Sequence, residues 1–449
     1  MMMSHIPRLN GIQTFFVIWS GQLISTLGSQ MTRFGLLVWA YQQAGAATAL
    51  ALLSFFSVSA YVVVGPFAGV LADRLDRRRV MLYADVGGTL ITAALLALYA
   101  TGRLALWNVY LAQTLKGACE ALRGPAYTAS VTLLMPREHY ARTAGLRSLS
   151  GSTAQVLAPF LAGLLLPFVG LGGVLLVDAG TFLIAGIALL VVRIPRPAPA
   201  HGGLSARAGA WEDIRSACGY IFRRPGLLGL LLIFAGMNLL AALTYFGVLS
   251  AMILARSGRN AMALAGVQSA LGAGALAGSL LVSAWGGPKR QIHGVLAAGG
   301  ISFLLGDFLF AAGRTVPVWV VAAFVSAFFI PFITSANTAI WQTKVIPAVQ
   351  GRVFSVQGML QNATAVVGYL AAGPLADLLF EPAMSAGGSL AGTFGWLVGT
   401  GPGAGMALMF VGTSILGGTG CLSGYLFRAV RRVEEDLPDH DAGPKENTP

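Results

Sequence analysis

Residues 69–79 read Gly-Val-Leu-Ala-Asp-Arg-Leu-Asp-Arg-Arg-Arg and lie between two long apolar stretches. Six of these eleven residues are charged, whereas only 10% of the whole chain is. Dense charge is excluded from the hydrocarbon core of a bilayer, so this segment is predicted to be a turn in water between two membrane-spanning helices. Its four arginines predict that the turn faces the cytoplasm.

The composition of the chain indicates an all-α polytopic membrane protein. Of its 449 residues 56% are hydrophobic and only 10% are charged, whereas roughly 25% of the residues of a soluble protein are charged. The net charge of +12 does not indicate nucleic-acid binding, because the basic residues are dispersed among the apolar stretches. Three scattered cysteines and five unclustered histidines predict no disulfide and no metal site. No phosphate-binding loop occurs, so we expect no cofactor, no direct ATP drive and no enzymatic activity.

Twelve segments reach the length of about 20 mostly apolar residues that a transmembrane helix needs. They lie at about 13–41, 48–72, 80–101, 105–134, 141–167, 172–193, 226–255, 261–285, 291–313, 316–343, 351–380 and 402–427. The first is too long for a cleaved signal peptide, so we expect it to be retained as a span. We predict six-helix halves at 1–193 and 226–428, joined by a linker at 194–225 and followed by a tail at 429–449. The linker contains an amphipathic helical pattern that is typical of the inner membrane surface.

The distribution of Lys and Arg predicts the orientation of these helices. With a cytoplasmic N-terminus, 21 basic residues fall on the inner side and four on the outer side. Both termini are therefore predicted to be cytoplasmic, in the inner membrane of a bacterium. Arg142 matches Arg352 and Gly163 matches Gly373 at the same offset, which indicates two pseudo-repeats with a solute site between them.

The charged turn and the repeat resemble the major facilitator superfamily of transporters. The signature of that superfamily is matched by Gly69, Leu71, Ala72, Asp73, Arg74, Arg77, Arg78 and Arg79, with Asp76 where a glycine is usual. The resemblance implies that Asp73 seals the cytoplasmic side against the start of helix eleven. That helix start contains Gly351, Arg352 and Gly358. A helix N-terminus carries partial positive charge, which favours a carboxylate.

Two further stretches resemble exporters of this superfamily. Gly145, Pro159 and Gly163 match a glycine-rich antiporter motif on helix five, although an ordinary packing face of small residues explains them equally well. Residues 21–29 and 123–127 resemble the branch of macrolide-efflux and enterobactin exporters. Both resemblances favour export over uptake.

The strongest candidate site is one face of helix four, where polar residues recur at spacings of three and four. That face carries Gln113, Lys116, Glu120, Arg123 and Tyr127. Intramembrane charge is costly, so each such residue is a functional candidate, and Glu120 is the best candidate for a proton carrier. Gln113 stands where drug–proton antiporters usually carry an arginine, which argues against the standard relay. A self-neutralised structural cluster is the alternative interpretation.

The resemblance implies that helices one, seven and ten also line the central cavity. Their polar candidates are Gln22, Ser29, Arg33, Asn238, Tyr245, Asn337 and Trp341, for which interhelical hydrogen bonding is the alternative role. Asp85, Asp178 and Asp307 fall on helices three, six and nine, which are outer scaffold helices in the superfamily. We expect Asp85 to be structural and leave the other two open.

The favoured function is proton-coupled export, by alternating access, of an amphipathic drug, antibiotic or siderophore-like solute. The expected partners are that solute, protons and the lipid bilayer, and we expect a monomer. A lysophospholipid flippase of the same fold is one alternative, and a membrane sensor or scaffold that moves nothing is another. The sequence assigns no role to the Gly-rich segment 386–405.

Overall fold

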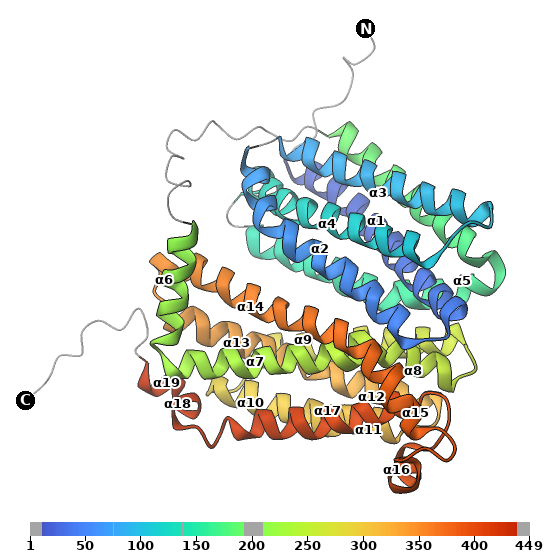
Figure 1. Ribbon diagram of the computed structural model, residues 1–449. Coiled ribbons are helices and arrows are strands. Elements are labelled where there is room, and N and C mark those ends of the chain that lie inside the picture. The colour runs from blue at the N-terminus through green and yellow to red at the C-terminus, as the bar shows by residue number, and fades with distance from the viewer. Residues whose placement is uncertain (1–10, 75, 137–138, 193–209, 438–449) are drawn as a thin grey trace, which may run out of the picture. The chain divides into compact units, whose positions relative to one another are not determined.

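The computed structural model describes residues 11–74, 76–136, 139–192 and 210–437 (Figure 1). Within those ranges the regular elements are α- and π-helices, and none is a strand. The chain divides into two compact units. The first comprises Met1–Ala200 with Ser257–Ser269, and the second comprises His201–Arg256 with Ala270–Pro449. The predicted domain boundaries themselves stay a prediction.

The first unit is built on five long helices. They are α1 (Gly11–Ala44), α2 (Ala47–Arg74), α3 (Arg77–Ala100), α4 (Leu106–Leu134) and α5 (Tyr140–Val191). Helix α5 contains the predicted fifth and sixth spans, and its direction changes at Gly170, where φ is 62° and ψ is −174°. A side chain is strained at such a φ, so glycine is the residue that permits this reversal between two spans.

The second unit contains the remaining helices, several of which include a π-helical segment. The linker and the seventh span form α6 (Ala210–Phe222), α7 (Pro225–Leu243), η2 (Thr244–Val248) and α8 (Leu249–Arg256). The ninth and tenth spans form α10 (Gln291–Ile301), η3 (Ser302–Asp307), α11 (Phe308–Ala312), α12 (Val316–Phe328) and α13 (Ile330–Lys344). The eleventh forms α14 (Pro347–Pro374), η4 (Leu375–Phe380) and α15 (Glu381–Met384). The chain ends in α16 (Ala391–Val398), α17 (Ala404–Ser423), α18 (Arg428–Arg431) and α19 (Val433–Asp436).

Each of the twelve predicted spans is occupied by helix; the eighth is α9 (Ala261–Trp285), which begins in the first unit and continues into the second. Nine stretches within the described ranges are long and apolar enough to cross a membrane. One of them, Gly145–Val191, holds two predicted spans, and α1 and α4 are not among the nine. Both of those helices carry the polar stripes that the sequence predicts, which lower their hydropathy. A count of spans that uses apolarity alone therefore omits these two helices, because their polar side chains lower the mean hydropathy.

The outward surfaces of both units are apolar, as expected for contact with lipid. Phe168, Leu378 and Trp396 are 81%, 78% and 77% exposed. The linker helix α6 is present where an amphipathic helix was predicted, and its Ala217 and Ile221 pack into the core of the second unit. Its place on a membrane surface stays a prediction.

The Gly-rich segment 386–405 is bonded to two partly buried charged side chains, Arg256 and Glu381. The guanidinium of Arg256 donates to the carbonyl oxygens of Gly403 at 3.2 Å, Gly313 at 2.9 Å and Val398. The carboxylate of Glu381 accepts from the backbone N–H groups of Gly403 and Met406, both at 2.9 Å, and so caps the start of α17. These two side chains give the segment, to which the sequence assigned no role, a fixed conformation.

We expect Arg256→Ala to lower the stability of the protein by roughly 3 kcal/mol, because hydrogen bonds from a charged donor are lost and carbonyls are left unpaired. The measurement is thermal unfolding in detergent, together with proteolysis within residues 386–405. Arg428→Ala is the matched control, since Arg428 is exposed. Equal melting temperatures for the two variants would contradict this role of Arg256.

Candidate functional site

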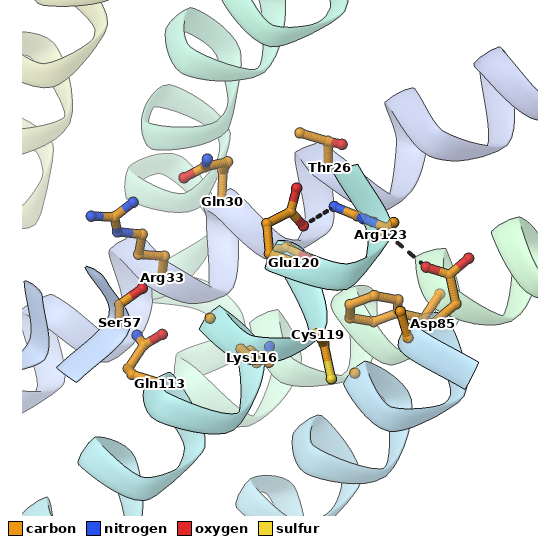
Figure 2. Close-up of a pocket in the computed structure, with 15 residues that line it drawn as sticks. Thr26, Gln30, Arg33, Ser57, Asp85, Gln113, Lys116, Cys119, Glu120 and Arg123 are labelled. Carbon is orange, nitrogen blue, oxygen red and sulfur yellow. Dashed lines mark hydrogen bonds and ion pairs between the residues drawn. The ribbon is translucent and has the colours of Figure 1, made fainter. Parts of the chain in front are cut away.

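The polar face of α4 lines a cavity of about 250 Å³ inside the first unit. Side chains from α1 to α5 surround it, and Figure 2 shows the labelled side chains of α1 and α4 that line it. Five of the predicted residues lie on its wall together with Glu120: Ser29, Arg33, Gln113, Lys116 and Arg123. The helical spacing of the α4 residues thus indicated correctly that they share one face.

A second cavity, of about 420 Å³, adjoins the first and shares the side chains of Thr26, Glu120 and Arg123 with it. Its wall includes Tyr127 of α4 and Arg147 of α5. The guanidinium of Arg147 lies 4.8 Å from the centre of the Tyr127 ring, a cation–π contact. Sequence reasoning did not identify Arg147, although an arginine inside a predicted span was a sufficient signal.

Arg123 joins two carboxylates from different helices. It forms an ion pair with Glu120 one turn away on α4, as the spacing allowed, and Figure 2 marks this pair together with the one to Asp85. Its Nη1 lies 3.5 Å from Oδ1 of Asp85 on α3. The other oxygen of Asp85 accepts a hydrogen bond from Gln22 of α1 at 3.1 Å. Asp85 therefore belongs to the charged cluster and anchors three helices to one another.

Lys116 pairs with Asp178 of α5 at 2.9 Å and not with Glu120. Asp178 is fully buried, and it also accepts hydrogen bonds from Ser29 at 3.1 Å and Thr92 at 3.0 Å. A buried carboxylate needs this full set of partners, because removal of a charge from water costs several kcal/mol. The sequence left the role of Asp178 open; in the structure it is the counter-ion of Lys116 on the polar face of α4.

The three acids of this cluster differ in their access to the cavity. The side chain of Glu120 is 54% exposed, whereas those of Asp85 and Asp178 are 2% and 0% exposed. Protons and solutes reach only an exposed carboxylate directly. Glu120 is therefore the member of the cluster that can exchange a proton or bind a cationic group without rearrangement of the helices.

The sequence profile described as Major Facilitator Superfamily matches residues 18–369 of the chain. The chain belongs to this superfamily. Macrolide efflux protein A of Streptococcus pyogenes is 25% identical over 370 residues, which cover 81% of this chain and 89% of that protein. Macrolide efflux protein A of Enterococcus faecalis is 26% identical over 326 residues, which cover 71% and 97%. The predicted resemblance to macrolide-efflux proteins is thereby confirmed.

The fold matches solved transporter structures of the superfamily. A bacterial homolog to the human lysosomal transporter Spinster, solved in an inward-facing and unoccupied conformation, superposes with a TM-score of 0.68 at 19% identity. The superposition covers 94% of this chain and 98% of that one. Identity at this level shows the fold alone, and the chain is accordingly a multi-pass membrane protein of the major facilitator fold.

The superfamily signature lies partly outside the described side chains. Gly69, Asp73 and Arg74 fall among the residues whose side chains the structure does not describe. Beyond them, Asp76 caps the N-terminus of α3 by accepting from the backbone N–H of Arg78 at 3.1 Å. The guanidinium of Arg78 donates to the carbonyls of Leu189 and Leu190, both at 2.7 Å, near the end of α5. This half of the signature thus ties the start of α3 to the end of α5.

The other residues predicted to act in gating or helix packing lie on α3, α5 and α14. Arg77 lies in the first turn of α3, Gly351 and Arg352 are exposed on α14, and Gly358 is partly exposed there. Gly145, Pro159 and Gly163 all lie in α5, as the proposed motif requires. Their roles in gating and packing stay predictions.

In the second unit the predicted cavity residues contact their own unit. Asn238 donates to the carbonyl of Phe234 at 2.9 Å, and buried Trp341 donates to Asn337 at 3.1 Å. Tyr245 donates to Asp307. The contact of Tyr245 is an interhelical hydrogen bond, the alternative role expected from the sequence, whereas those of Asn238 and Trp341 lie within their own helices. Solute binding by these residues stays a prediction.

We expect Asp178→Asn to destabilise the protein by roughly 3 kcal/mol, because Lys116 then loses the carboxylate that neutralises it. Removal of both charges, in Lys116→Met with Asp178→Asn, is expected to recover much of that loss. The measurement is thermal unfolding of the two single variants and the double variant. A double variant no more stable than Asp178→Asn would show that the ion pair does not couple the two residues.

We expect Asp76→Ala to cost about 1 kcal/mol through loss of the helix cap, and Asp76→Gly only a few tenths. Glycine is also the usual residue at this place in the superfamily signature, so the second variant is a natural control. Thermal unfolding of both variants measures the difference. Equal destabilisation by Ala and Gly would show that the Asp76 side chain acts through another contact.

Proposed function

We propose that the chain is a secondary active exporter of the bacterial inner membrane that moves an amphipathic solute outward in exchange for protons. Membership of the superfamily and relatives named for macrolide efflux support this proposal over an enzymatic role. The observation that carries it is an exposed carboxylate, Glu120, on the wall of a charged cavity inside an apolar helix bundle. Macrolides, other drugs and siderophore-like compounds are the proposed solutes.

The position of Arg123 between two carboxylates makes protonation of Glu120 tolerable. When Glu120 binds a proton, its ion pair with Arg123 weakens, and Arg123 keeps Asp85 as its carboxylate partner. Arg123 is then not left without a counter-charge, a state that would cost several kcal/mol. The cluster can therefore change its protonation state without loss of the α3–α4 contact.

Competition between a proton and a cationic solute for Glu120 then allows the two to be exchanged at a single site. A macrolide that carries an amino sugar is a cation near neutral pH, and it binds an ionised carboxylate better than a protonated one. Proton binding lowers the affinity for such a cation, and by linkage the cation lowers the affinity for a proton. The nearby Tyr127 ring and the apolar wall suit the uncharged part of an amphipathic solute.

Alternating access completes the proposal. We propose that Asp73 stabilises the inward-closed state through the start of α14, from Gly351 to Gly358, with both termini of the chain in the cytoplasm. The support is the signature match and the attraction of a helix N-terminus for a carboxylate. A monomer is sufficient for this scheme, because both units belong to one chain.

The test uses the purified chain in proteoliposomes with erythromycin, a macrolide, and an imposed pH gradient. Accumulation of erythromycin that disappears when a protonophore collapses the gradient supports proton-coupled export. Erythromycin flux that is equal with and without the gradient would overturn the coupling. Movement of a labelled lysophospholipid without erythromycin flux would identify a flippase, and binding without any flux would identify a sensor.

Glu120→Gln is expected to lose gradient-driven accumulation while it retains its fold, because the neutral amide cannot exchange a proton. Glu435→Gln is the matched control: Glu435 lies at the exposed C-terminal end of the described chain and pairs with Arg290 at 2.9 Å on the surface. Thermal unfolding of both variants reports the fold. Wild-type accumulation by Glu120→Gln would exclude Glu120 as the proton carrier.

A further inference from the structure

A second buried carboxyl group lies in the other unit, in a different setting. Asp307, the last residue of η3, is 0% exposed. Its Oδ2 accepts a hydrogen bond from Thr413 of α17 at 2.6 Å, and its Oδ1 accepts one from the hydroxyl of Tyr245 in η2. Three segments far apart in the sequence thus converge on one carboxyl group.

Asp307 has no cation as partner within the part of the chain that the structure describes. Asp85 and Asp178, the corresponding buried acids of the first unit, pair with Arg123 and Lys116. An ionised carboxylate in an apolar interior with two neutral donors retains a large desolvation cost, whereas the protonated acid does not. Of the three buried acids, Asp307 is therefore the one whose negative charge is least compensated by its described partners.

The titratable groups around Asp307 are few. Among the helices packed against η3, α11 and α12 carry none, α10 carries only His293 and α17 only Cys421. The imidazole of His293 lies 3.0 Å from the hydroxyl of Tyr425, and the thiol of Cys421 faces Gly299, two helical turns before Asp307. Tyr245 is therefore the titratable side chain that touches the carboxyl group. Among the described residues, no charged side chain next to Asp307 fixes the protonation state of its carboxyl group.

Both partners of the Tyr245–Asp307 hydrogen bond lie in π-helical segments, η2 (Thr244–Val248) and η3 (Ser302–Asp307). Such segments are rare, and they occur frequently at functional sites because they turn a side chain out of the regular helical register. The Tyr245 ring is held edge-on by Phe310 and Phe410, with ring centres 5.8 and 5.7 Å away. Its hydroxyl is thereby aimed at the carboxyl group.

An unused acceptor lies beside this pair. The hydroxyl oxygen of Ser326 in α12 is buried and has no hydrogen-bond partner in the described chain. It lies against the backbone next to Asp307, since a Cβ placed on Gly306 would be 1.9 Å from it, and the Tyr245 side chain is close to it as well. Part of residue Tyr245 is exposed, whereas its hydroxyl lies in the interior against the carboxyl group.

We propose that Asp307 is a proton-binding site of the second unit, reached through Tyr245. In addition to Glu120, it would be a second carboxyl group that couples proton movement to transport. In the step, the Asp307 carboxylate takes up one proton from water and becomes a neutral acid. Its new O–H donates to the Tyr245 oxygen, and the Tyr245 hydroxyl hydrogen turns to the free oxygen of Ser326. No electron moves and no further reactant is needed. The coupling role rests on the proposed function, whereas the proton site does not.

The first experiment needs no solute: infrared spectra of the purified wild type and of Asp307→Asn are compared at neutral pH. We expect the carbonyl stretch of a protonated carboxyl group in the wild type, its loss in Asp307→Asn, and its retention in the exposed control Asp436→Asn. Tyr245→Phe is expected to shift the frequency of the band, because one hydrogen bond to the group is lost. Absence of a wild-type band that is specific to Asp307 would overturn the proton site.

The second experiment measures erythromycin in proteoliposomes. Asp307→Asn is expected to retain exchange of labelled for unlabelled erythromycin but to lose accumulation driven by a pH gradient. Gradient-driven accumulation at the wild-type level would overturn the coupling role. If the wild type moves no erythromycin, the proposed function fails while the infrared result still decides the proton site. If Asp307→Asn does not fold, loss of gradient-driven accumulation in Tyr245→Phe supports the proposal, and its retention overturns it.

Discussion

The cost of charge in an apolar interior determines how both units of this protein are built. In the first unit, Arg123 and Lys116 meet carboxylates on three helices, and these ion pairs fix the relative positions of α3, α4 and α5. In the second unit, the guanidinium of Arg256 donates to three backbone carbonyls. Apart from the Glu120–Arg123 pair within α4, these charges are satisfied by groups distant in the sequence. The pairing requirement therefore selects one arrangement of helices among the many that apolar packing alone would permit.

In both halves, the N-terminus of the third helix is capped by a carboxylate, but the carboxylates come from different parts of the chain. The third helix of the first half begins at Arg77 and is capped by Asp76 from the turn that precedes it. The third helix of the second half is α10, and its first N–H groups, of Gln291 and Ile292, donate to the carboxylate of Glu434 at 3.0 and 2.9 Å. That carboxylate comes from the C-terminal segment. Where the second half lacks the acidic turn of the signature, a carboxylate from elsewhere in the chain fulfils the same electrostatic requirement at the helix start.

The sequence predicted what depends on local periodicity and missed what depends on long-range contacts. Helical spacing placed Glu120 and Arg123 in one pair and Lys116 on the same face, and the length of the apolar runs located the helices. Spacing within one helix carries no information about Asp178, which competes with Glu120 for Lys116 and lies 62 residues further on. The π-helical turns at Thr244–Val248 and Ser302–Asp307 were equally invisible, because the apolar residues around them continue without a break in pattern. Arg147 was overlooked for a simpler reason, since a lone arginine has no local partner to draw attention to it.

The partners of each acid decide what it can contribute to transport. Asp178 is fully buried and is held by a lysine and two hydroxyl donors, so water in the cavity does not reach it directly. It can hold helices together but is a poor carrier. Glu120 shares its arginine with Asp85 and is exposed, so in the proposed scheme the solute and the proton compete for it directly. Asp307 has only hydroxyl partners, and its ionisation therefore depends on how much water reaches Tyr245. We propose that a change of hydration at that face alters the charge of Asp307 more than that of an ion-paired acid, and that this difference links a conformational change to proton uptake.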